Sequence, residues 1–155
     1  MKRLDRIRGC LLGGTAGDAL GYAVEFCSEE EMFSRYGEKG ITEYRLTDGL
    51  GRISDDTQMT AYTANGLLLA ATKAAREGGQ PDYVKEIGAC YVDWLKGQVR
   101  GVRNEQGDSD STGAVTGNIL GAKLGAKKIP YKYLDALEGK EILEVLANDL
   151  YVGEN

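Results

Sequence analysis

The sequence has no histidine and few cysteines. Its 155 residues contain three cysteines and two prolines. Without histidine, a Ser-His-Asp triad and the usual zinc site are excluded, and so is the commonest general base. The cysteines (Cys10, Cys27 and Cys90) are odd in number and form no CxxC pair, so a disulfide framework is not expected. Any chemistry must therefore use carboxylates, hydroxyls, thiols or a hard metal ion.

Basic clusters and long apolar runs are also missing. Nineteen Lys and Arg residues are scattered among 24 Asp and Glu residues, which gives a net charge of −5. Nucleic acid and anionic membranes are therefore not expected partners. No uncharged run reaches the ~20 residues of a membrane-spanning helix. The basic N-terminus, MKRLDRIRG, is interrupted by an acid and precedes no signal-like apolar core. We expect a cytoplasmic protein whose residues 1–155 form one domain.

Helical patterns fill most of the chain, which predicts an all-α fold. Apolar spacing predicts a helix that ends near Gly21, and Ser28-x-x-Glu31 is a capping box for a short one. Residues 38–54 lack helical periodicity and are expected to form a loop with a short extended piece. Residues 96–107 resemble a polar linker. Further helices are predicted at 55–78, from 81 onwards, at 110–125, after Pro130 and at 139–152.

The helix that begins at Pro81 has a predicted buried face. Its apolar residues recur at helical spacing and would lie on one side. These residues are Tyr83, Ile87, Cys90, Tyr91, Trp94 and Leu95.

Glycines recur every fourth residue in two of the predicted helices. They stand at 9, 13, 17 and 21, and again at 113, 117, 121 and 125. Each glycine inside a helix costs ~0.8–1 kcal/mol relative to alanine, so the missing side chains must serve a purpose. The charged flanks do not suit lipid. We therefore expect the two helices to pack closely in the core of a water-soluble protein. This packing would bring Asp18, Glu25, Asp108 and Asp110 towards one another.

Two acidic clusters stand where helices are predicted to begin, in ISDDTQMT at 53–60 and GDSDSTGAVTGNILG at 107–121. Asp and Ser dominate helix starts, so both clusters could be simple caps. A cap needs only one such side chain, however, and each cluster offers two carboxylates. Carboxylates and hydroxyls are the ligands that Mg²⁺ takes. Four aspartates would balance the charge of two divalent ions, which together can activate water.

Other acidic or glycine-rich motifs match less well. No stretch supplies an EF-hand loop, and GGTAG at 13–17 lacks the Gly-Lys-Ser/Thr of a P-loop. The string Asp108-x-Asp110-x-Thr112 resembles the DxDxT of haloacid-dehalogenase-like phosphotransferases. That motif should follow a buried apolar strand, and here it follows VRNEQG.

Three segments together resemble the ADP-ribosylglycohydrolase family. They are GCLLGGTAGDALGYAVEF at 9–26, ISDDTQMT at 53–60 and GDSDSTGAVTGNILGA at 107–122, and the tail from Ile129 to a final ANDL is also similar. The resemblance implies an all-α fold with two Mg²⁺ ions, with Mn²⁺ as a possible substitute. It also implies hydrolysis of the glycosidic bond between ADP-ribose and its acceptor, which would be a protein side chain or a small molecule.

The same resemblance assigns roles to individual residues. The family's metal-binding triplets fall on two groups, Ser54, Asp55, Asp56 and Asp108, Asp110, Ser111. Glu25 and Asp56 would be catalytic, with Glu25 polarising a water or protonating the leaving group. Asp18 would support the site from behind.

The chain is shorter than members of this family between the two metal motifs, with a junction near residues 97–106. Three interpretations follow. The chain could be a minimal hydrolase, completed by a partner. It could be a non-catalytic remnant or a metal- or ADP-ribose-binding module. It could also be a hydrolase of another ribosyl substrate. Helices that lose their usual partners would expose apolar residues and favour self-association. The expected residues are Leu67, Leu68, Leu69 and Trp94.

Overall fold

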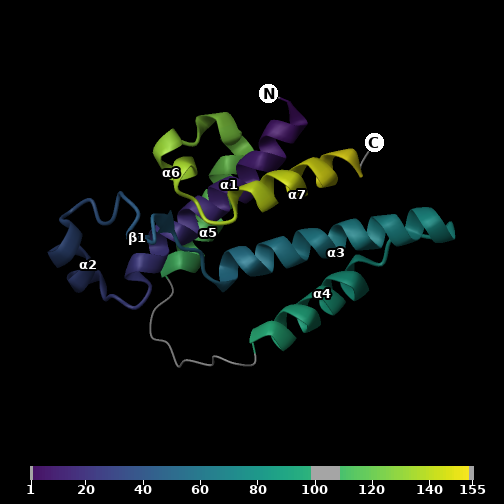
Figure 1. Cartoon of the computed structure of the whole chain (residues 1–155), viewed down its shortest axis with the longest axis horizontal. Coiled ribbons are helices and arrows are strands. Elements are labelled where there is room, and N and C mark those ends of the chain that lie inside the picture. The colour runs from purple at the N-terminus through teal and green to yellow at the C-terminus, as the bar shows by residue number, and fades with distance from the viewer. Residues whose placement is uncertain (1, 99–108, 154–155) are drawn as a thin grey trace.

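Seven α-helices dominate the described chain, as the all-α prediction required (Figure 1). The structure is a computed structural model that describes residues 2–98 and 109–153; the side chains of residues 109, 110 and 112 lie outside that description. The α-helices are α1 (Arg3–Gly21), α2 (Glu29–Tyr36), α3 (Asp55–Glu77), α4 (Tyr83–Gln98), α5 (Ser109–Leu124), α6 (Tyr131–Asp135) and α7 (Lys140–Val152). Two short 3₁₀ turns, η1 (Tyr22–Val24) and η2 (Ala126–Lys128), follow α1 and α5.

Helices α1 and α5 pack antiparallel through their glycines. Gly9 faces Gly121, Gly13 faces Gly117, and Gly17 faces Gly113, and a Cβ on any of the three α1 glycines would overlap a backbone carbonyl of α5. Even the next atoms are close, because a Cβ on Gly9 would lie 2.7 Å from the amide nitrogen of Ala126. The predicted close approach is therefore confirmed. It sets the C-terminal end of α1 beside the N-terminal end of α5.

The hydrophobic core lies where α7 crosses α1. Leu12 and Leu143 are each 2% exposed, and Ala147 is fully buried. The other buried members of this cluster are Leu11, Ala19 and Leu137. Arg8 of α1 also donates a hydrogen bond to Asn148 Oδ1 of α7 at 2.9 Å. The C-terminal segment is thus an integral part of the core.

Helices α3 and α4 form a long antiparallel hairpin beside this core (Figure 1). Gly66 of α3 lets the backbone of Ile87 approach, since a Cβ there would lie 2.6 Å from Ile87 Cα. Polar pairs link the two helices along their length: Trp94 Nε1 to Gln58 Oε1 at 3.1 Å, Thr63 Oγ1 with Tyr91 Oη at 2.6 Å, and Lys73 Nζ to Glu86 Oε2 at 2.5 Å.

The predicted buried face of α4 is partly wrong. Tyr83 and Leu95 are 45% and 57% exposed, whereas Glu86 is buried. Lys73 supplies the charge partner that lets this carboxylate face α3. Apolar spacing alone could not reveal a buried ion pair. The residues Ile87, Cys90, Tyr91 and Trp94 do face inward, at least in part.

Two of the four apolar residues that were predicted to be exposed are exposed, and two are half-buried. Leu67 and Leu69 are exposed. Leu68 is half-buried near Gly153, and Trp94 is half-buried through its contact with Gln58.

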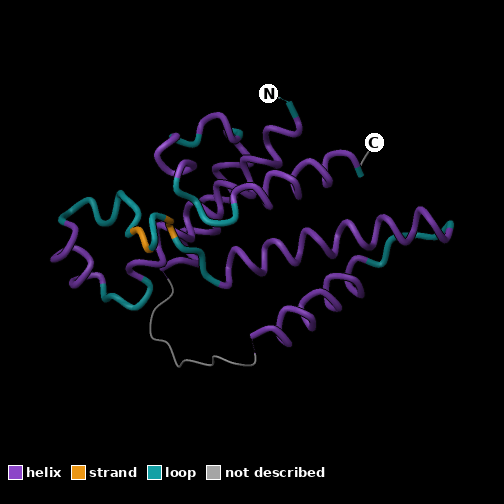
Figure 2. Tube along the Cα trace, in the orientation of Figure 1, coloured by secondary structure: helices purple, strands orange, loops and turns teal. Residues whose placement is uncertain are grey.

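A small β-hairpin precedes α3, within the segment predicted to hold an extended piece (Figure 2). Strand β1 (Leu46–Thr47) pairs antiparallel with β2 (Leu50–Gly51), and Gly51 also bridges to Leu137. Residues ahead of α3 are thereby tied to the turn between α6 and α7. In the part of the chain that is described, no helix combines the length and apolar character needed to cross a bilayer.

Candidate functional site

The first acidic cluster lies at the N-terminus of α3. Ser54 is the N-cap residue, and its hydroxyl accepts a hydrogen bond from the Asp56 amide at 3.1 Å. The simple capping role is thus confirmed for Ser54. Asp55 and Asp56 follow in the first turn, where Asp55 is exposed and Asp56 is half-buried with its Oδ2 atom shielded from solvent. The cap accounts for the serine but not for two successive carboxylates.

Asp18 holds this helix start from the side of α1. Its carboxylate is completely buried and accepts hydrogen bonds from the backbone amides of Ser54, at 3.1 Å, and Thr57, at 3.2 Å. The Thr57 hydroxyl donates a further short hydrogen bond to Asp18 Oδ2. A buried acceptor at a helix N-terminus suits the free amides there.

Burial raises the pKa of Asp18, although the hydrogen bonds from Thr57 and Ser54 oppose that shift. Tyr44 reaches the same end of α1, since its hydroxyl lies 3.5 Å from the Ala16 carbonyl; it also donates to the Tyr133 carbonyl at 2.9 Å. Burial raises the pKa of Tyr44 too, with smaller contributions from Tyr133 and Asp18. The Tyr44 ring packs over Gly51, where a Cβ would lie 2.7 Å from the ring.

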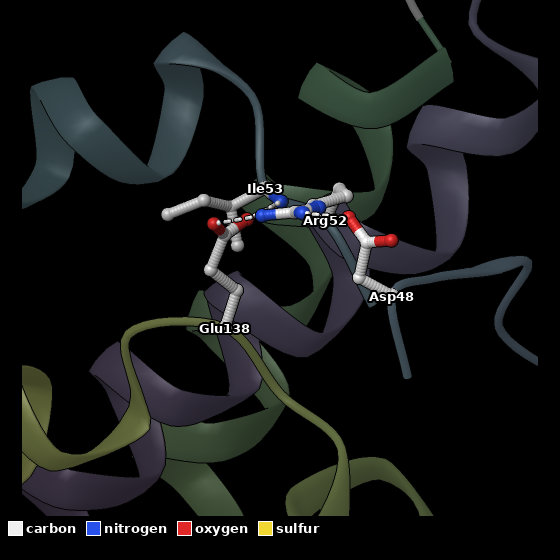
Figure 3. A network of polar contacts seen from close by, with 4 residues as sticks. All are labelled: Asp48, Arg52, Ile53 and Glu138. Atoms are coloured by element: carbon white, nitrogen blue, oxygen red, sulfur yellow. Dashed lines mark hydrogen bonds and ion pairs between the residues drawn. The ribbon is translucent and has the colours of Figure 1, made fainter. Parts of the chain in front are cut away.

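Glu138, from the C-terminal part of the chain, binds the residues that directly precede α3 (Figure 3). It lies in the turn before α7, and its Oε2 accepts a hydrogen bond from the Ile53 amide at 3.1 Å. Its Oε1 pairs with Arg52 Nη1 at 2.8 Å, while Arg52 Nη2 contacts Asp48 at 3.0 Å. Both acids raise the pKa of Arg52, chiefly through the hydrogen bond and charge of Glu138.

The other predicted site residues lie on neighbouring elements. Glu25 is half-buried directly after η1, and Ser111 is half-buried in the first turn of α5. Helix α5 contacts both η1 and α3. The fold therefore brings together the three elements that carry Glu25, the Ser54 cluster and Ser111. Asp108 lies outside the described residues, and Asp110 lies on α5 with its side chain outside the description.

The donor chemistry is that of a hard cation. Ser54, Asp55 and Asp56 offer a hydroxyl and two carboxylates, all oxygen donors of the kind that Mg²⁺ takes. Among the described residues, no group of three or more acidic, thiol or imidazole side chains lies close enough to hold a metal ion. A complete site would thus need further carboxylates, such as those of Asp108 and Asp110, which lie outside the described side chains.

Two of the residues that hold the helix start were not found by sequence reasoning. Thr57 is the last residue of the SDDT string and could have been noticed as a hydroxyl in the first turn of α3. Glu138 had no signal, because a single glutamate in a turn has no motif and its partners, Arg52 and Ile53, are more than 80 positions away.

Comparison with known proteins gives the family. The model of the family described as ADP-ribosylglycohydrolase matches residues 1–105 and 98–155, which together span the whole chain. The chain is also similar to an ADP-ribosyl-[dinitrogen reductase] glycohydrolase of Rhodospirillum rubrum, with 35% identity over 106 residues that cover 64% of this chain and 32% of that protein. The match thus spans about a third of the relative's length. No solved structure matches significantly. The chain belongs to the ADP-ribosylglycohydrolase family.

Proposed function

We propose that this chain hydrolyses the glycosidic bond between ADP-ribose and an acceptor, with two Mg²⁺ ions at the N-termini of α3 and α5. The observation that carries the proposal is the buried Asp18 carboxylate, which fixes the start of α3 against α1. The same end of α1 meets the N-terminal end of α5 through Gly17 and Gly113. The starts of α3 and α5, to which the two acidic motifs belong in sequence, therefore lie at one end of the α1–α5 pair.

The residues that would hold the ions are those of the two motifs, Ser54, Asp55 and Asp56 with Asp108, Asp110 and Ser111. Bound magnesium would supply positive charge that orients ribose hydroxyls and a water molecule. The Oδ2 of Asp56 is shielded from solvent, which suits a group that must keep a fixed orientation. Asp55 is exposed and free of burial constraints, so it can turn towards an ion.

Glu25 would move the proton in this reaction. Cleavage breaks the bond between the anomeric carbon and the acceptor nitrogen or oxygen, and water adds its oxygen to that carbon. Glu25 would take the proton from the water or give one to the leaving group. The developing positive charge on the sugar is of the kind that neighbouring carboxylates stabilise. We propose an ADP-ribosylated protein as the substrate, as the relative's name indicates for that enzyme.

A second candidate is a module of the same family that binds metal or ADP-ribose without turnover. The exposure of large apolar side chains on several helices favours this binding module. Val84 on α4 is 86% exposed, Ile119 on α5 is 63% exposed and Ile142 on α7 is 70% exposed. Such surfaces are those of a domain that lacks some of its packing partners. They also support self-association of the chain.

Turnover separates the two candidates. Peptides ADP-ribosylated on arginine or on serine are incubated with the chain and Mg²⁺, and released ADP-ribose is measured. The hydrolase proposal predicts release that is lost without metal and in Asp56→Asn. Glu141→Ala, which removes an exposed carboxylate on α7, serves as the control and should retain activity. Metal binding without any release from either peptide would favour the binding module instead.

A further inference from the structure

We propose that Glu138 is a positioning residue that sets the start of α3 and, through it, the orientation of the proposed metal-binding motif. This inference rests on the proposed function. It assigns a functional task to the turn between α6 and α7, which lies more than 80 residues from the motif in sequence.

The contacts of Glu138 reach the residues directly before the motif. Its two carboxylate oxygens have separate tasks, since Oε2 accepts from the Ile53 amide and Oε1 pairs with Arg52 (Figure 3). The backbone strengthens this link, because the Gly51 amide donates to the Ala136 carbonyl at 2.7 Å and the Glu138 amide donates to the Gly51 carbonyl at 3.2 Å. Residues 51–53 are therefore fixed at three consecutive positions.

The first turn of α3 is held by hydrogen bonds both before and after its two aspartates. Glu138 binds the amide of Ile53, and Asp18 binds the amides of Ser54 and Thr57. Asp55 and Asp56 lie between these attachment points. A shift of the chain at Ile53 would rotate the first turn of α3 and move both carboxylates. The two anchors come from α1 and from the turn before α7, which share the core described above.

The ion pair itself contributes little to stability. The side chains of Arg52 and Glu138 are 33% and 30% exposed, and pairs that solvent reaches contribute modestly. Groups that orient metal ligands, in contrast, typically change metal affinity or activity by about 10- to 100-fold when they are removed. Loss of Glu138 should therefore affect the motif far more than the stability of the fold.

The test compares Glu138→Ala, Glu138→Gln and the control Glu141→Ala. Glu141 is an exposed acid three residues away, so the control removes the same charge from the same region. Two quantities are measured under conditions where each variant is folded: hydrogen exchange at the amides of Ser54, Asp56 and Thr57, and the affinity for Mg²⁺ by calorimetry. Glutamine retains an oxygen that can accept from the Ile53 amide, so it tests rescue of that bond.

We expect Glu138→Ala to speed exchange at these three amides and to weaken Mg²⁺ binding by about tenfold. Glu138→Gln should recover most of both losses, and Glu141→Ala should match the native chain. A mere loss of stability would speed exchange at core amides of α1 and α7 as well, whereas loss of positioning is expected only at the start of α3. Unchanged exchange in Glu138→Ala, or equal effects in Glu141→Ala, would overturn the proposal.

The two proposals fail in different ways. If the native chain binds no Mg²⁺, the metal proposal is wrong, and the exchange rates still decide whether Glu138 positions the start of α3. If the native chain and Glu138→Ala bind Mg²⁺ with equal affinity, only the inference about Glu138 is wrong. If Glu138→Ala does not fold, Glu138→Leu decides, because it removes both acceptor oxygens and keeps most of the side-chain volume: several-fold faster exchange is expected, and no change would overturn the proposal.

Discussion

The two helix pairs of this molecule are held together by different means. Helices α1 and α5 meet glycine to glycine, so their backbones touch, and only a few side chains, such as Cys10 with Asn118, contact one another beside the glycine pairs. Helices α3 and α4 instead meet through side chains, with one glycine contact at Gly66 and polar pairs such as Lys73 with Glu86. At its paired glycines, the first interface leaves no space for a larger residue. The second has adjustable side chains, and parts of its outer surface are apolar and exposed.

The two interfaces should therefore differ in how well they tolerate substitutions. The backbone contact of α1 and α5 fixes the end where the proposed metal ligands gather, so a small displacement there would move the site. The α3–α4 hairpin extends away from that end, and only the start of α3 belongs to the site (Figure 1). We therefore expect substitutions to have large effects in the first pair and graded effects in the second.

The largest contrast is expected from the same substitution in the two pairs. Gly13→Ala would place a Cβ onto the carbonyl of Gly117, which can yield only if the helices separate. We expect a loss of about 3 kcal/mol or more in the free energy of unfolding, at the upper end of overpacking effects. Gly88→Ala on α4 meets open space and should gain ~0.5–1 kcal/mol from the better helix former. Urea unfolding measures both, and a neutral Gly13→Ala would contradict the close packing.

An intermediate effect is expected from the buried ion pair of the hairpin. Lys73→Met leaves the buried Glu86 carboxylate without its cation. Because the Lys73 side chain is half exposed, we expect a loss of about 1–2 kcal/mol, less than for a fully buried pair. Lys96→Met is the control, since its pair with Asp93 is exposed on both sides and should contribute under ~0.5 kcal/mol. Equal losses in the two variants would show that burial of Glu86 has no effect on the hairpin.

The smallest effect on stability is expected at the cap of α3. Ser54→Gly keeps a residue that helix starts accept, so the loss should be a few tenths of a kcal/mol. Removal of the hydroxyl should nevertheless weaken Mg²⁺ binding if Ser54 is a ligand. Ser28→Gly, at the exposed capping box of α2, is the matched control and should leave Mg²⁺ binding unchanged. Unaltered binding in Ser54→Gly would mean that Ser54 only caps the helix.

Local sequence rules predicted much of the fold. Short-range patterns indicated the capping box at Ser28 and the helix end at Gly78. The four-residue spacing of glycines within each helix likewise indicated the close packing of α1 and α5. Long-range polar contacts were not predictable in this way. The inward position of Glu86 depends on Lys73 of another helix, and the attachment of Glu138 to Ile53 depends on how α7 crosses α1.

The site follows the same division. The Ser54 cluster was recognisable from its sequence, and Asp18 was expected to support it. The structure shows the Asp18 carboxylate buried and bound to the amides of Ser54 and Thr57, while its role in a metal site stays a prediction. The metal ligands themselves remain a prediction, because Asp108 and the side chain of Asp110 lie outside the described residues.

A calorimetric titration of Mg²⁺ into the purified chain tests the central claim most directly, with Mn²⁺ as a check. We predict two bound ions in the native chain, loss of binding in Asp110→Ala, and unchanged binding in Glu141→Ala. A folded chain that shows no saturable binding of either ion would contradict the account. The acidic motifs at the starts of α3 and α5 would then be helix caps alone.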